Sequence, residues 1–168
     1  ESYFTDAAAD IDYRVGVTTS SVNRNFSLAV PGFPDVPMFS TGANGELVGQ
    51  GECGLAQPWV EGPGDDVASA FSCVAGTVGT GGSGYEMPLA ATVLALGEHA
   101  EAGGPNEGFY RAGGDSLLVI VYVLDEDDCS LTEGGELGTT PGGVCVPDQC
   151  VGLYGLENTK LFLDDVAG

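Results

Sequence analysis

Hydrophobic and polar positions along the chain predict two strands that lie far apart in the sequence. Residues 11–20 (IDYRVGVTTS) are rich in β-branched and aromatic side chains and end in small hydroxylated ones, which is typical of a strand that runs into a loop. Residues 116–124 (SLLVIVYVL) are almost uninterrupted aliphatic sequence, the pattern of a strand covered on both faces. The second of these strands is the clearer prediction.

Between the two predicted strands, apolar residues recur at the spacings of three and four that are typical of helices. A helix is predicted from Asp65 to Gly76, and its apolar face consists of Val67, Ala70, Phe71 and Val74. A second helix is predicted from about Tyr85 to His99, with Pro88 in its first turn, where a missing amide donor costs little. The apolar side of this second helix consists of Leu89, Val93, Leu94 and Leu96. A last helix is predicted over residues 156–166.

Glycine and proline mark the connections. Residues 31–64 contain PGFPDVP, TGANG and EGPG, which predict a long connection with a short strand or two. Because helices alternate with strands, we expect a doubly wound, mostly parallel α/β sheet flanked by helices. The length of 168 residues fits a single domain, 1–168.

The charge and hydropathy of the chain exclude some classes of binding partner. The formal net charge is -21, from 25 acidic and 4 basic residues, which argues against nucleic acid and anionic membrane surfaces as partners and makes divalent cations natural counterions. Solubility alone is an equally good explanation for most of this charge. The sequence has no apolar run of membrane-spanning length and no signal-peptide pattern in residues 1–10, so we expect a soluble, already processed chain without direct membrane insertion.

Cysteine usage indicates an oxidising compartment. Five cysteines and one histidine occur, without paired C-x-x-C spacing, so disulfides fit better than a zinc site. The expected pairs are Cys53 with Cys73, and Cys129 with either Cys145 or Cys150, which leaves one thiol free or paired outside the chain. We therefore expect a secreted or cell-surface protein.

Side chains with oxygen atoms that could bind a metal follow one predicted helix and one predicted strand. In open parallel sheets the ligand site lies beyond the carboxyl ends of the strands. The loop 79–84 (GTGGSG) would bring hydroxyls to that edge, and residues 125–128 (DEDD) would bring four carboxylates. Alone, the first is usually a turn with a helix cap and the second a solvated loop, but together they favour a Mg²⁺ or Ca²⁺ site. The candidate metal ligands are Asp125, Thr80, Ser83 and Asp127.

Catalytic patterns are weak. His99 is the only histidine and lies beside Glu98 and Glu101, which is typical of a charge-complementing surface residue. No serine or cysteine has an identifiable partner base in the sequence. A hydrolase using the acidic cluster therefore ranks below a binding protein, and we expect no enzyme activity.

Four stretches carry a resemblance to a known family. Residues 12–19 (DYRVGVTT), 79–86 (GTGGSGYE), 106–111 (NEGFYR) and above all 118–130 (LVIVYVLDEDDCS) resemble the von Willebrand factor A (VWA) domains of secreted or surface proteins of myxobacterial type. The resemblance implies a metal-ion-dependent adhesion site, in which three loops hold a divalent cation that takes a carboxylate from a protein partner. It also implies that Asp125 is the third-loop aspartate and Thr80 the second-loop threonine, with Ser83 as the alternative.

The chain departs from this family at its start. VWA domains begin with a strand that ends in Asp-x-Ser-x-Ser, and no such segment occurs here. In the family's sheet that strand lies between those predicted at 11–20 and 116–124. A cleaved precursor, a strand inserted by another polypeptide and a rearranged sheet are all open explanations. We hypothesise that a separate segment completes the sheet by strand addition.

Two functions follow as expectations. The first is an extracellular adhesion or assembly module that uses a divalent cation to engage a protein partner. The alternative is a structural subunit of a surface filament or matrix, with a vestigial metal site.

Overall fold

The computed structural model describes residues 11–28, 32–34, 36–111, 116–125, 128 and 130. Within these ranges the chain forms short strands, two α-helices and one turn of 3-10 helix. In chain order the elements are β1 (Tyr13–Val15), β2 (Arg24–Leu28), β3 (Val36–Ser40), β4 (Val60–Gly62), α1 (Val67–Thr77), α2 (Pro88–Leu96) and η2 (Glu98–Ala100).

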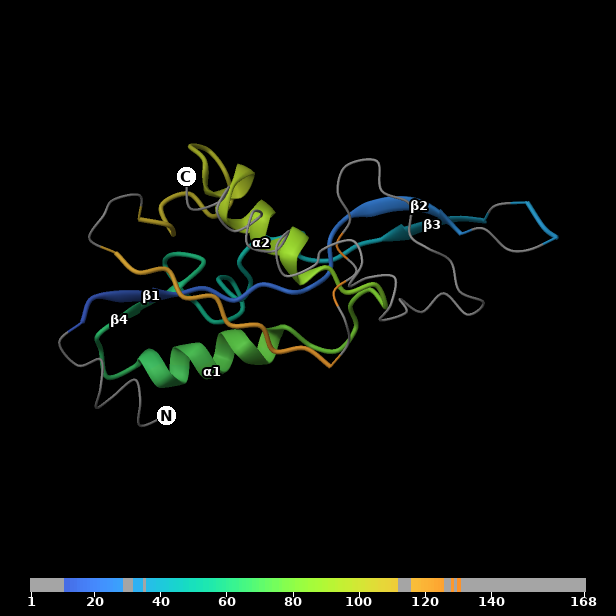
Figure 1. Cartoon of the computed structure of the whole chain (residues 1–168). Coiled ribbons are helices and arrows are strands. Elements are labelled where there is room, and N and C mark those ends of the chain that lie inside the picture. Colours follow the sequence, from blue (N-terminus) through green and yellow to red (C-terminus); the bar gives the residue numbers. More distant parts are fainter. Residues whose placement is uncertain are drawn as a thin grey trace.

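The strands form two separate antiparallel pairs. In the first pair, β1 lies beside β4, with Tyr13 opposite Gly62 and Val15 opposite Val60. In the second, β2 lies beside β3 over five residue pairs, from Arg24 and Ser40 at one end to Leu28 and Val36 at the other. This β2–β3 hairpin extends away from the helices (Figure 1).

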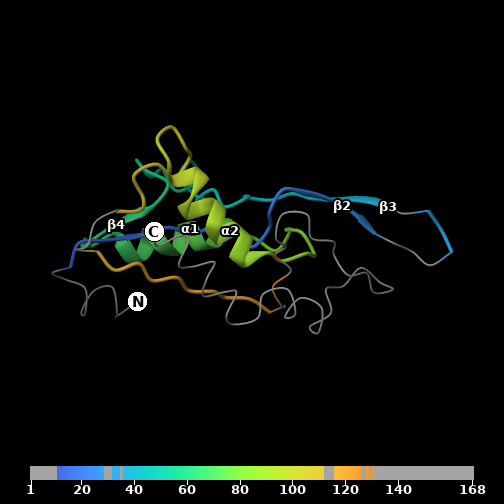
Figure 2. The same cartoon turned by 45° about the horizontal axis from the view of Figure 1, so that its top comes forward.

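The predicted doubly wound parallel sheet is therefore wrong for the described residues. The strand predicted at 11–20 exists only at Tyr13–Val15, and its partner β4 comes from the long connection and runs antiparallel to it. Residues 116–124 form no strand, although they run lengthwise past α1 in both views (Figures 1 and 2). Aliphatic sequence suits a strand, but a strand also needs a neighbour to complete its hydrogen bonds.

Helix α1 confirms the first helical prediction and covers the β1–β4 pair. Val67 and Val74 of this helix are buried and form a core cluster with Val60 of β4. Six partly buried side chains pack around this cluster: Tyr13, Val15, Val17, Cys53, Leu55 and Ala70. Spacings of three and four residues thus place the apolar face of α1 against the sheet, as periodicity predicts.

Helix α2 confirms the second helical prediction, but a different face is buried. Of the four residues predicted to form its apolar side only Leu89 is buried, and the buried set is Pro88, Leu89, Ala91, Thr92 and Ala95. The segment around Gly45 comes so close that a Cβ there would lie 2.7 Å from the carbonyl oxygen of Ala91. Because α2 is apolar on every side, periodicity does not select a face, and this close approach selects the one with small residues.

A buried asparagine holds that approaching segment in place. The Asn106 side chain is fully buried and accepts a hydrogen bond from the Leu47 amide at 2.9 Å. Its amide group donates to the carbonyl oxygens of Gly45 at 2.9 Å and Ala95 at 3.0 Å. Asn106 therefore ties the loop before β4 to helix α2.

The structure joins Cys53 and Cys73 by a disulfide, the first of the predicted pairs. The bond links the loop before β4 to α1. The other three cysteines, Asp127 and the helix predicted at 156–166 lie outside the described residues. In the part of the chain that is described, no helix has the length and apolarity needed to cross a membrane.

Candidate functional site

Loops from distant parts of the sequence meet at the start of α2. The Ser21 hydroxyl is buried and accepts a hydrogen bond from the Ser83 amide at 2.9 Å. Close by, the Met87 amide donates to the carbonyl oxygen of Ser20 at 2.7 Å. A Cβ at Gly82 would lie 2.6 Å from the Ser21 hydroxyl oxygen, so the approach of the 79–84 loop requires glycine at this position. We call this meeting of loops the α2 rim.

Asp128 and Ser130 bring the end of the apolar run to the same place. The Leu89 amide donates to Asp128 Oδ1 at 3.2 Å, and the Ala90 amide donates to Ser130 Oγ at 2.8 Å. The Ser130 hydroxyl in turn donates to Asp128 Oδ1 at 2.8 Å. These two side chains satisfy amides of the first turn of α2, which would otherwise lack partners because no earlier helical carbonyl reaches them.

Burial changes the acidity of the Asp128 carboxyl. Removal from water raises the pKa of Asp128, while the hydrogen bonds from Ser130 and from the Leu89 and Ser130 amides lower it. The net direction is upward, so desolvation outweighs these hydrogen bonds. Asp128 thus acts as a partly desolvated cap of α2.

The predicted metal ligands are not all brought together in this way. Ser83 joins the α2 rim, where its hydroxyl accepts a hydrogen bond from the Tyr85 amide at 3.1 Å. Thr80 and Asp125 are exposed, and among the described residues no hydrogen bond joins either of them to Ser83. The described residues contain no group of three or more His, Cys, Asp or Glu side chains placed to hold a metal ion.

His99 has a structural role. Its Nε2 lies 2.8 Å from the carbonyl oxygen of Asn44, in the segment that packs on α2. This contact explains the position of the only histidine in the chain.

The apolar run 117–124 alternates in exposure. The side chains of Leu117, Val119, Val121 and Val123 are 88%, 68%, 76% and 90% exposed. Those of Leu118 and Ile120 are only partly exposed. A period of two is the signature of an extended backbone, so one face of the run is turned towards the molecule and the other towards solvent.

The backbone of this run has no strand partner among the segments that the structure describes. Within the described residues, the N–H and C=O groups of residues 117–124 make no backbone hydrogen bond. The run is nevertheless attached to the molecule, because the hydroxyls of Tyr122 and Thr92 lie 3.0 Å apart. Burial raises the pKa of Tyr122, while the bond to Thr92 lowers it.

Comparison with family models, with curated proteins and with solved structures finds no match for this chain. We therefore infer the function from the surface chemistry of the chain.

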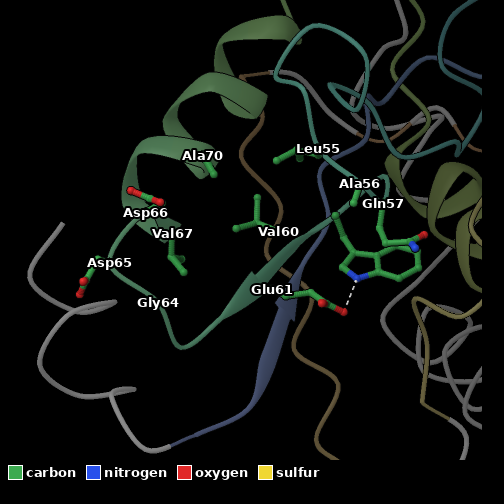
Figure 3. A pocket seen from close by; sticks show the side chains of 11 residues that line it. Leu55, Ala56, Gln57, Val60, Glu61, Gly64, Asp65, Asp66, Val67 and Ala70 are labelled. Carbon is green, nitrogen blue, oxygen red and sulfur yellow. Dashed lines mark hydrogen bonds between the residues drawn. The ribbon is translucent and has the colours of Figure 1, made fainter.

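A shallow hollow lies beside α1 and β4 (Figure 3). Its volume is about 290 Å³, with an apolar floor that includes Leu55 and Val60 and a rim that includes Asp65 and Asp66. Glu61, at its edge, already binds Arg14 at 3.3 Å and the Trp59 indole at 3.1 Å. Arg14 Cζ also lies 5.2 Å from the centroid of the Trp59 ring. The charged side of the hollow is thus partly occupied by internal contacts.

Sequence reasoning missed the residues that join the α2 rim. Nothing in the sequence distinguishes Ser21 and Ser130 from other serines. Their buried hydroxyls accept hydrogen bonds from amides that are 62 and 40 residues away in the chain. Asp128 was one of four consecutive acidic residues, and nothing local separates it from Asp125. No local pattern marks Asp128 and Ser130 as partners of amides 39 and 40 residues earlier in the chain.

Proposed function

We propose that this chain is an extracellular binding module that engages a protein partner in adhesion or assembly, and that it is not an enzyme. The observation that carries the proposal is the exposed apolar face of residues 117–124. Contiguous apolar surface on a highly charged protein commonly marks a place where another molecule binds. The Cys53–Cys73 disulfide supports an extracellular location, since such bonds persist in oxidising compartments.

A photocrosslinking experiment tests this proposal. A photoreactive residue replaces Val121 in the full chain, and the chain is irradiated on native surface material of the producing cells. We expect one discrete crosslinked protein product. The matched control places the same group at Phe39, which is 73% exposed on the projecting hairpin. Absence of a product, or identical products from both positions, would contradict the proposal.

A divalent cation bound at Asp125 belongs to the same proposal. Its support is the exposed carboxylate of Asp125, which stands in a run of four acidic residues on a chain of net charge -21. Calorimetric titration with Ca²⁺ and Mg²⁺ tests it: we expect binding heat that Asp125→Ala removes and Asp65→Ala retains. Equal heats in both variants would remove Asp125 as a ligand.

A structural subunit of a surface filament or matrix is the second candidate. It is favoured by the β2–β3 hairpin, which projects from the body and exposes Phe33 and Phe39, each at 73%. Polymerisation that survives excess chelator and is lost in Phe39→Glu would favour this function over cation-dependent adhesion.

A further inference from the structure

We propose that residues 117–124 bind an extended β-strand of a partner protein, and that this strand carries lysine or arginine at the end that lies beside Asp125. The inference rests on the proposed function and names the class of partner. The run would act as a strand that lacks its neighbour.

The side chains are arranged as in a sheet. Odd-numbered residues of the run point to solvent and even-numbered ones are less exposed, as on the two faces of a strand. Four exposed aliphatic side chains in a row would offer an added strand an apolar face for cross-strand packing. Such a face on one extended segment is too narrow for a helix groove, which needs walls on both sides.

The backbone of residues 117–124 also favours a strand as the partner. Within the part of the chain that is described, the backbone groups of residues 117–124 have no ladder partner. A ligand that contacted only the side chains of the run would form no hydrogen bonds with these backbone groups. A peptide strand would form a row of N–H···O=C bonds with them, which is how strand addition gains affinity.

The run is already held in position at its carboxyl end. Tyr122 is attached to Thr92, and Asp128 and Ser130 are attached to the first turn of α2. Ordering a flexible segment on binding costs free energy, and an acceptor that is fixed beforehand avoids part of that cost. These attachments use side chains, and no described residue occupies the backbone groups of the run.

The negative charge beside the run favours a partner strand with a basic residue at the adjacent end. The apolar run leads into the exposed carboxylate of Asp125, which is followed in sequence by three more acidic residues. The net charge of -21 repels a second copy of this chain and attracts a basic one. A strand with a basic residue at the end beside Asp125 is therefore favoured over self-association through this face.

Synthetic peptides test the inference on the full chain. The probe is a nine-residue peptide of alternating valine and threonine with lysine at both ends. One matched control carries methyl groups on every second backbone nitrogen, which keeps the side chains but removes hydrogen bonds. A second control has glutamate in place of lysine. Fluorescence anisotropy measures affinity, and hydrogen–deuterium exchange measures protection of residues 117–124.

We expect the lysine peptide to bind and to slow exchange in residues 117–124. Methylation, the change to glutamate and Val121→Glu should each weaken binding by about tenfold or more, because each removes hydrogen bonds, charge attraction or apolar packing. Phe39→Glu, which changes an equally exposed apolar residue elsewhere, should leave the affinity within about twofold.

Several outcomes would overturn the inference. Equal binding of the methylated peptide, or no protection of residues 117–124 by the lysine peptide, would exclude strand pairing; a crosslink from Val121 would then still support protein binding. Self-association through this face without peptide would make a second copy the occupant. Slow exchange of residues 117–124 in the free chain would show that the face is already covered, and would count against the proposed function itself.

Discussion

The carboxylate of Asp128 accepts a hydrogen bond from the backbone amide of Leu89 at 3.2 Å, across 39 residues of sequence. This bond connects the end of the exposed apolar run to the first turn of α2. Its consequence for stability depends on pH because burial raises the pKa of Asp128 above the ordinary value of 3.8. The folded chain therefore holds the proton more tightly than the unfolded chain does.

Asp128→Asn should reveal this linkage. Between pH 3.8 and the raised folded pKa the folded state binds more protons, so the free energy of unfolding contributed by Asp128 is greatest below pH 3.8 and falls as pH rises. The wild-type chain should therefore lose stability relative to Asp128→Asn across that window. Urea unfolding of both proteins over a pH series measures the difference. A difference that stays flat or grows with pH would contradict the assigned direction.

Gly82→Ala should disrupt the α2 rim. The added methyl group would lie 2.6 Å from the Ser21 hydroxyl oxygen and would push the loop away from it. We expect faster hydrogen exchange at the Ser83 amide, which donates to that hydroxyl, and a lower melting temperature. Gly81→Ala is the matched control, since a Cβ there meets nothing within 4 Å. Equal effects of the two substitutions would mean that the close approach is not important.

Asn106→Leu should be strongly destabilising. The substitution keeps a side chain of similar size but leaves the Leu47 amide and two backbone carbonyls without partners in a buried place. We expect a loss of about 3 kcal/mol in the free energy of unfolding, measured by chemical denaturation. Gln57→Ala, at an exposed position, should change it by less than about 0.5 kcal/mol. A small effect at Asn106 would show that this loop does not depend on its side chain.

The Cys53–Cys73 bond closes a loop with a sequence separation of 20. Replacing both cysteines with alanine should lower the free energy of unfolding by about 3 kcal/mol, because the unfolded chain regains conformational freedom. Cys73→Ser alone should cost a similar amount, since either change breaks the bond. Unchanged stability in the double variant would mean that the bond does not form in the protein.

Arg14→Met should be visible in the fluorescence of Trp59, the only tryptophan in the chain. Arg14 lies over the Trp59 ring, binds Glu61 and donates to the carbonyl oxygen of Gly108. Its loss should expose the indole, shift the emission to longer wavelength and cost about 1 kcal/mol or more. Arg111→Met, which removes a surface bond to Asp12, should leave the emission unchanged. The same shift in both variants would point to a general loosening of the fold.

Local patterns predicted α1 and α2. Spacings of three and four around Val67 and Val74 place α1, and Pro88 marks the first residue of α2. These signals are local, because a helix forms its hydrogen bonds within its own segment. The buried face of α2 could not be predicted in this way, since the approach of Gly45 comes from a distant loop.

The candidate site was predicted only in outline. The sequence indicated that the 79–84 loop and the acidic segment after the apolar run are the places to look, and Ser83 and Asp128 do reach the start of α2. Which carboxylate turns inward was not predictable, because four acidic residues in a row differ only in their three-dimensional surroundings. The resemblance to VWA domains pointed to Asp125, which is exposed.

The sequence by itself determined where α1 and α2 lie, the acidic character of the protein and the aliphatic character of residues 117–124. Tertiary structure alone decided that β1 pairs antiparallel with β4 and that no described segment pairs with the apolar run. The physical reason is that strand pairing depends on backbone groups far apart in the chain, and nothing in an aliphatic run states which neighbour will complete it.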